Sequence, residues 1–330
     1  MSQAVEDLGL PIQGPGAGQD TEEIAGKSPR QLFWARFKQD KVALVGVGVI
    51  VILAVLAVGA PWISSNIAHR GPNDISLARE MTDDFGLPVG PNGTYLFGAD
   101  KAGRDLFVRV IYGARTSLLV AIFATGISVS IGVVLGIIAG YFGGKIDTFI
   151  SRIIDMILSL PLLLFAIGLG AACGTTKTGC NFFFLEIKPG LGLVVFIIAA
   201  FSWPYIARIV RGNTLSIREK EYVEAARSLG ASNRRIMFRE VLPNLVAPII
   251  IYSTLIIPAN VIFEAALSFL GVGVPPRTPS WGRMLADASR ILDVAPWMML
   301  FPAGFLVLTT LAFNLVGDGL RDALDPRSGR

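Results

Sequence analysis

The stretch Glu224–Asn244, EAARSLGASNRRIMFREVLPN, is a polar insertion between two long apolar runs. Residues Leu191–Val210 precede it and Leu245–Phe269 follow it. Each run is long enough to cross a bilayer, which needs about 20 residues. A segment this rich in charge is costly to place in lipid. We therefore expect a helix–turn–helix that lies at the membrane surface and is offered to a soluble partner.

The composition extends this interpretation to the whole chain. Of its 330 residues, 52% are hydrophobic and only 16% are charged, whereas a soluble domain carries about 25% charge. Six apolar runs could span a membrane, and the backbone inside lipid must satisfy its own hydrogen bonds. The sequence thus predicts an all-α integral membrane protein with six transmembrane helices, near Val42–Trp62, Thr116–Gly140, Ile150–Ala171, Leu191–Val210, Leu245–Phe269 and Trp297–Val316.

The distribution of basic residues predicts the orientation. If both termini and the polar insertion face the cytoplasm, most of the 29 Lys and Arg residues lie on the inner side. We expect a multi-pass protein of the cell (inner) membrane, with cytoplasmic tails at 1–41 and 318–330. Residues 1–23 read as disordered, and no cleavable signal peptide is visible, so the first span should remain as an anchor. The net charge of +4 reflects topology and anionic lipid, and it requires no nucleic acid.

The polar insertion has the pattern of a short amphipathic helix that ends in a turn. One face should carry Tyr222, Ala225, Ala226 and Leu229, with Glu224 solvated. Gly230 suits the left-handed position that ends a helix, and Ser232 or Asn233 can cap the next one. Leu242 and Pro243 close the insertion, and Pro243 limits how far the second helix continues. The alternative is an ordinary amphipathic helix resting on lipid headgroups.

The insertion resembles the EAA loop of the membrane subunits of ABC importers. Glu224, Ala225, Ala226 and Gly230 match that motif, as do Leu242 and Pro243, whereas Glu240 and Val241 depart from it in minor ways. Four further segments resemble C-type permease subunits of dipeptide and oligopeptide importers. They are Phe97–Leu118, Arg152–Ile167, Phe263–Ala288 and Asn314–Arg327. Together the matches cover most of residues 30–327.

The resemblance implies a fold and a set of partners. It places a type I ABC importer (MetI-like) core at 114–317, with the EAA loop at 211–244, behind a first span and external loop at 42–113. It implies a second homologous permease subunit, two cytoplasmic P-loop ATPase subunits and an external solute-binding protein. ATP and Mg²⁺ would be bound by the ATPases, so this chain would carry no cofactor. The docked EAA loop would pass the closing motion of the ATPases to the membrane helices, and the solute would be a peptide, with nickel complexes or oligosaccharides as alternatives.

The motifs that are absent agree with a transport subunit that is not an enzyme. The only Gly-Lys pair, Gly144-Lys145, is followed by Ile and lacks the upstream glycine of a P-loop. His69 is the sole histidine, which excludes a zinc-protease motif and disfavours a Ser-His triad. Two rival functions stay open at this point. An ion-coupled secondary transporter would call for inverted repeats, and a membrane scaffold would not transport at all.

Two acidic residues inside the spans are candidates for the translocation path. Asp155 lies three residues from Arg152, so the two could pair on one helix face near the interface. Glu264 lies deeper, in the fifth span, where an ionisable residue is a functional candidate by default. It could face the cationic amino terminus of a peptide, or it could hold its helix to a partner subunit.

Small residues, prolines and cysteines give the remaining signals. Gly132, Gly136, Gly140 and Gly144 form a stripe that favours close helix packing. Pro161, Pro204, Pro258 and Pro302 can kink four spans. Cys173 and Cys180 are the only cysteines and can close a short external disulfide, with two free thiols as the alternative. No metal site is expected beside them.

Overall fold

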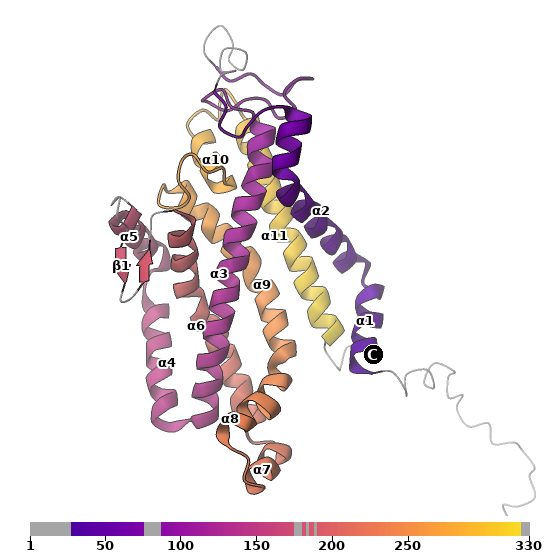
Figure 1. The fold of residues 1–330 in the computed structure, drawn as a ribbon, viewed down its shortest axis with the longest axis vertical. Helices are drawn as coiled ribbons and strands as arrows, with labels where there is room; N and C mark the ends of the chain where they lie inside the picture. Colours follow the sequence, from indigo (N-terminus) through magenta and orange to yellow (C-terminus); the bar gives the residue numbers. More distant parts are fainter. Residues whose placement is uncertain (1–27, 76–86, 175–179, 183–184, 188–189, 325–330) are drawn as a thin grey trace, which may run out of the picture.

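A computed structural model describes residues 28–75, 87–174, 180–182, 185–187 and 190–324, and these residues form an elongated bundle of helices (Figure 1). The prediction of disorder in residues 1–23 lies outside this range. The helices are α1 (Pro29–Gln39), α2 (Lys41–Ile63), α3 (Leu106–Phe142), α4 (Gly144–Ser159), α5 (Leu162–Gly174), α6 (Leu191–Ile217), α7 (Glu221–Ser228), α8 (Asn233–Ile236), α9 (Leu242–Phe269), α10 (Trp281–Ala288) and α11 (Trp297–Leu324). Two short antiparallel strands, β1 (Cys180–Phe182) and β2 (Leu185–Ile187), form a hairpin between α5 and α6.

The N-terminal helices are capped by side chains that the sequence supplies locally. Ser28 and Gln31 form a capping box at the start of α1. Asp40 ends α1 and caps α2, since its carboxylate accepts from the backbone N–H groups of Val42 and Ala43. The α1 helix therefore occupies the part of the 1–41 tail next to the membrane, where it packs against α11.

The predicted spans are present, but the third is broken. Five helical segments are long and apolar enough to cross a membrane: Lys41–Ala68, Leu106–Phe142, Leu191–Ile217, Asn233–Phe269 and Trp297–Leu324. The sixth consists of α4 and α5, which are bent by 83° at their junction. The apolar run Ile150–Ala171 is therefore divided between two helices, and the predicted kink at Pro161 is confirmed, whereas Pro204, Pro258 and Pro302 lie inside α6, α9 and α11. Pro161 provides the reason, because proline disfavours the helical conformation of the residue before it, and Leu160 is extended at φ −75° and ψ 134°.

The centre of the bundle is the long contact between α3 and α6, the most extensive helix pair among the described residues. Gly132, Gly136 and Gly140 allow this approach. A Cβ atom placed on Gly136 would lie 2.7 Å from the carbonyl oxygen of Ala207, which is closer than real side chains come. The predicted small-residue packing is confirmed for these three glycines. Gly144 does not belong to the stripe, because it begins α4 at φ +52° and has open space around it.

The spans also begin and end at places that the apolar runs did not mark. The α3 helix starts at Leu106, ten residues before the predicted second span, because Asp105 caps it through the N–H groups of Phe107 and Val108. After α9, the chain turns at Gly271, where φ is +85°, and α10 then packs against α9, α11 and α3. The short helices α7 and α8 lie at the opposite end of the bundle from α10 (Figure 1).

Candidate functional site

The polar insertion folds at one end of the bundle as a helix, a tight turn and a second helix. We call residues 218–244 the coupling segment because they connect the end of α6 to the start of α9. The α7 helix carries Glu221 and Glu224 in its first turn and Arg227 in its last, an arrangement that complements the helix dipole. Gly230 follows in the left-handed conformation, at φ +79°. The Ala231 N–H donates to the carbonyl of Ala226 at 3.0 Å, as in a helix-ending Schellman turn. The predicted turn at Gly230 is confirmed.

The second helix of the segment runs directly into the membrane. Ser232 caps α8 by accepting from the N–H of Arg235 at 3.4 Å, so Ser232 rather than Asn233 is the capping residue. A π-helical turn, Met237–Val241, then joins α8 to α9. Pro243 lies in the first turn of α9 and does not interrupt a single helical run from Asn233 to Phe269. The expectation that Pro243 limits the unbroken second helix is met only in part. The α-helical pattern of α8 stops at Ile236, but the π-helical turn, in which the Leu242 N–H donates to the Met237 carbonyl, carries the helical run past Pro243.

The α7 helix packs on the bundle through Val223 and leaves most of the predicted face exposed. Val223 is fully buried, with Ala226 packed beside it, whereas Tyr222 and Leu229 are 42% and 88% exposed. Ala225 is also exposed. The predicted four-residue face is therefore divided: Ala226 packs inward, and Tyr222, Ala225 and Leu229 form an exposed strip. The strip leaves apolar side chains exposed on the surface of the chain, where a partner can cover them.

The buried side of the coupling segment is attached firmly to the spans. Val223 and Ile236 belong to one apolar cluster with residues of α3, α6, the π-helical turn and the start of α9, namely Ile137, Tyr141, Ile206, Val210, Val241 and Leu245. The Tyr141 hydroxyl also donates to the Asn233 Oδ1 atom at 2.9 Å. The Arg218 Nη1 atom donates to the Gly140 carbonyl at 3.0 Å. Because these contacts join α7 and α8 to three spans, a displacement of the segment would move the ends of those spans with it.

Glu264 is completely buried between helices of this chain. Its Oε2 atom accepts from the Ser117 hydroxyl of α3 at 2.8 Å, and its Oε1 atom accepts from the Ser268 hydroxyl at 2.7 Å. Ser268 in turn accepts from the Val274 N–H at 3.1 Å, so the carboxylate also holds the turn that follows α9. This geometry favours a structural link. A role for Glu264 on the translocation path stays a prediction.

Asp155 pairs with a residue that the sequence did not suggest. Its Oδ1 atom accepts from the Arg208 Nη2 atom of α6 at 2.8 Å, so the expected pair with Arg152 was wrong. Both partners are 57% exposed. One turn closer to the coupling segment, Asp147 and Arg211 form a second, two-point ion pair between α4 and α6. Two ion pairs therefore connect the helices α4 and α6.

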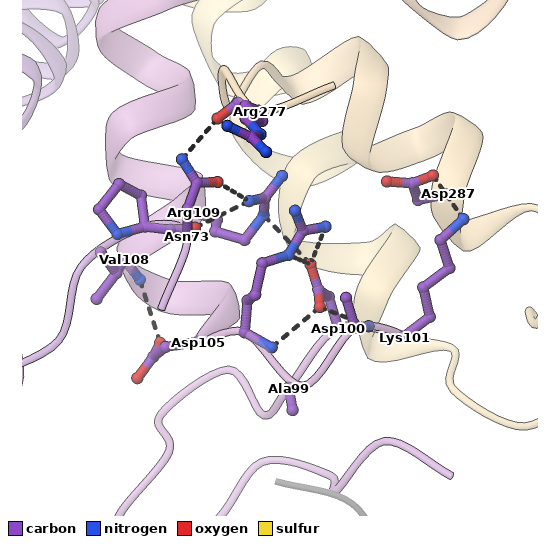
Figure 2. A network of polar contacts seen from close by, with 12 residues as sticks. Asn73, Ala99, Asp100, Lys101, Asp105, Val108, Arg109, Arg277 and Asp287 are labelled. Carbon is purple, nitrogen blue, oxygen red and sulfur yellow. Dashed lines mark hydrogen bonds and ion pairs between the residues drawn. The ribbon is translucent and has the colours of Figure 1, made fainter. Parts of the chain in front are cut away.

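A buried polar network, which sequence reasoning missed, fixes the loops at the other end of the bundle (Figure 2). The Asp100 carboxylate accepts from the Ala102 and Arg104 N–H groups at 2.9 and 3.0 Å and lies 3.3 Å from the Arg109 Nε atom. The Arg109 Nη1 atom donates to the Asn73 Oδ1 atom at 3.0 Å, and Asn73 donates onward to the Arg277 carbonyl at 2.7 Å. The network joins three segments that are far apart in the sequence. Only the resemblance of Phe97–Leu118 to permeases pointed to it.

The predicted disulfide between Cys173 and Cys180 is supported at Cys173 only. Cys173, near the end of α5, is buried and disulfide-bonded. The side chain of Cys180 lies outside the described residues, so the pairing of Cys173 with Cys180 stays a prediction. In the described part of the chain, no group of three His, Cys, Asp or Glu side chains could hold a metal ion.

Comparison with known proteins agrees with this architecture. Residues 132–330 match the binding-protein-dependent transport system inner membrane component, and residues 28–79 match the N-terminal TM domain of oligopeptide transport permease C. The glutathione transport system permease protein GsiD of Salmonella typhimurium is 43% identical over 301 residues, which are 91% of each chain. GsiD of Escherichia coli O157:H7 is 40% identical over the same length and coverage.

A solved structure shows the same fold at low sequence identity. An inward-facing structure of the MetNI methionine ABC transporter superposes with a TM-score of 0.55 and 18% identity, over 67% of this chain and 98% of that chain. The fold and the segment that joins its spans define a membrane permease of the MetI-like type. The chain belongs to the family of inner membrane components of binding-protein-dependent transport systems. It is thus an ABC importer permease subunit and not an enzyme, and partner ATPases hydrolyse the ATP.

Proposed function

We propose that this subunit imports short peptides. The observation that carries the proposal is the similarity, over 91% of the chain, to permeases named for glutathione, which is a tripeptide. That similarity favours peptides over the nickel complexes and oligosaccharides that the sequence left open. Membership of an ABC importer family sets aside the ion-coupled secondary transporter and the scaffold without transport.

The coupling segment is proposed to be the contact with an ATPase subunit. The exposed strip of Tyr222, Ala225 and Leu229 would be covered by a groove of that subunit, and Ala225 would let the two backbones approach closely. Glu224 and Gly230, which match the EAA motif, would shape the first turn and the end of α7. The buried contacts of Val223 and Ile236 would carry the movement of the docked helix to α3, α6 and α9.

The complete importer is proposed to contain four kinds of chain. This subunit would pair with a second homologous permease subunit, two cytoplasmic P-loop ATPases would supply ATP and Mg²⁺, and an external binding protein would deliver the peptide. The excess of Lys and Arg on one side supports cytoplasmic termini and a cytoplasmic coupling segment in the inner membrane. The exposed strip on α7 and the excess of Lys and Arg residues would then both face the cytoplasm, which is the compartment that holds the ATPases.

The test compares two exposed apolar positions at opposite ends of the bundle. Leu229→Asp places a charge in the strip, and Leu96→Asp makes the same change at a residue that is 57% exposed in the loop before α3. Each complex is purified from native membranes in mild detergent and identified by mass spectrometry. We expect the ATPases and ATP-driven tripeptide uptake to be lost with Leu229→Asp and kept with Leu96→Asp.

Two results would contradict the proposal at different points. ATPases retained by Leu229→Asp, with normal uptake in proteoliposomes, would show that α7 is not the coupling contact. Wild-type vesicles that accumulate a nickel complex or an oligosaccharide, but no tripeptide, would refute the peptide substrate.

A further inference from the structure

The exposed faces of the spans fall into two chemical classes. From Val45 to Val58 on α2 and from Leu119 to Val134 on α3, the exposed side chains are apolar, apart from Ser130, whose hydroxyl binds a carbonyl of its own helix. On α6 and α4, by contrast, Tyr205 is 54% exposed, and the Arg208–Asp155 ion pair is exposed three residues further along. Ionised side chains within a span face a protein or a water-filled cavity rather than lipid. The faces of α2 and α3 therefore suit lipid. On α4 and α6, Phe149 and Met156 are exposed as well, but the patch formed by Tyr205, Arg208 and Asp155 does not suit lipid.

A cleft of about 410 Å³ opens on this second face, between α6 and α9 and beside the start of α5. We call it the α6–α9 cleft. The residues that matter for its chemistry are Leu162, Phe201, Ser202, Tyr205, Tyr252 and Asn260. Its size lies within the range of about 300–1,000 Å³ that small-molecule sites occupy. The cleft is near the middle of both spans, since Phe201 and Tyr205 fall halfway along α6 and Tyr252 and Asn260 halfway along α9.

The break in the third span lies beside the same cleft. Leu162, the first residue of α5, lines the cleft, and Phe165 contacts Phe201 edge to face, with ring centroids 5.2 Å apart. Leu160 and Pro161 form the non-helical junction between α4 and α5, and both are exposed. Non-helical backbone at membrane depth is tolerated only where protein covers it or water reaches it. This second observation, independent of the side chains, also indicates that the face is not exposed to lipid.

The polar side chains of the cleft are held in place and still have hydrogen-bonding capacity available to a ligand. Asn260 is buried and fixed on two sides, because its Nδ2 atom donates to the Thr125 hydroxyl at 2.8 Å and its Oδ1 atom accepts from the Ser202 hydroxyl at 2.9 Å. Ser202, which lines the cleft, uses its only hydroxyl proton in this bond, so its oxygen remains able to accept a hydrogen bond. Within the described part of the chain, the hydroxyls of Tyr205 and Tyr252 have no hydrogen-bond partner.

We propose that the α6–α9 cleft is a binding subsite on the translocation route, which takes the main chain of a short peptide; this rests on the proposed peptide import. The Tyr205 and Tyr252 hydroxyls can donate to or accept from a peptide amide, and the Ser202 oxygen, whose proton is donated to Asn260, can accept from one. The aromatic walls accommodate apolar side chains. No charged residue is among the described residues that line the cleft. Such a site recognises the amide backbone without selecting one side-chain charge, so it suits a conduit that passes peptides of different sequence.

The chain offers a matched pair of positions for the test. Ser202→Cys places a thiol in the cleft, and Ile131→Cys places one on the apolar face of α3, at a residue that is 37% exposed. The two lie at the same depth, because Gly132 of α3 abuts the Trp203 carbonyl of α6. The complete wild-type importer, in which Cys173 is disulfide-bonded, gives the background. The probe is a charged, membrane-impermeant methanethiosulfonate, and the modified residue is identified by mass spectrometry in proteoliposomes.

We expect Ser202→Cys to be modified at least tenfold faster than Ile131→Cys, and a tripeptide at saturating concentration to slow that modification at least threefold. Tyr205→Phe should lower ATP-driven tripeptide uptake by about 2- to 12-fold, the range for one lost hydrogen bond. Equal rates at the two cysteines would overturn the proposal in favour of a dry contact with the second permease subunit. Fast modification that the tripeptide does not slow would overturn the peptide subsite. In either case, wild-type uptake in the same vesicles would show that the import function itself stands.

Discussion

Replacement of Gly230 by valine should uncouple ATP hydrolysis from transport. Gly230 has φ +79°, and a Cβ atom placed on it meets nothing within 4 Å. The cost of Gly230→Val is therefore purely conformational. A left-handed conformation costs an L-residue about 1–2 kcal/mol, and more for a β-branched side chain. That cost corresponds to about a 5- to 30-fold shift away from the native turn.

The distorted turn would lose the hydrogen bond from the Ala231 N–H to the Ala226 carbonyl and change the angle between α7 and α8. Because α7 holds the exposed strip and α8 continues into α9, we expect ATPase activity to persist while peptide uptake per ATP falls at least fivefold. Uptake and phosphate release are measured together in proteoliposomes. Gly230→Asn is the control, since asparagine tolerates the left-handed region and should keep most of the coupling. Normal uptake by Gly230→Val at normal expression would refute the reasoning, as would an equal defect in Gly230→Asn.

Two further predictions concern the bundle itself. Gly136→Leu should prevent assembly of the α3–α6 pair, because the new Cβ atom would lie 2.8 Å from the Cβ atom of Val210. The detergent-extracted variant should therefore aggregate in size-exclusion chromatography. The control Gly126→Leu, which has open space on the same helix, should elute normally. Glu264→Leu should lower thermal stability by leaving two buried serine hydroxyls without their acceptor, at about 1–3 kcal/mol for each. Glu264→Gln keeps an acceptor in place and should lose less thermal stability. The midpoint of thermal unfolding measures both variants, and a Leu variant as stable as the Gln variant would contradict the structural role of Glu264.

The sequence by itself determined the features that depend on local physics. The length of the apolar runs decided that the chain spans a membrane, because a lipid-exposed backbone must form helices. The left-handed turn at Gly230 was readable from residue type and order alone, whereas for the cap of the next helix the sequence offered Ser232 and Asn233, and the structure selected Ser232. The glycine stripe on α3 was readable as well, since residues four apart fall on one helix face. The prediction that Gly144 is the fourth member of the stripe was wrong, because α3 ends at Phe142.

Tertiary structure alone decided which neighbours these elements meet. An amphipathic pattern shows that α7 has two faces, but only the position of α3 and α6 makes Val223 the buried side and Leu229 the exposed one. Asp155 pairs with Arg208, 53 positions away, instead of Arg152 on its own helix. Such contacts depend on where distant spans lie relative to one another, which no local pattern encodes. For the same reason the α6–α9 cleft cannot be predicted from any single stretch of sequence. Its walls come from α5, α6 and α9, and the packing of these three helices creates the space between them.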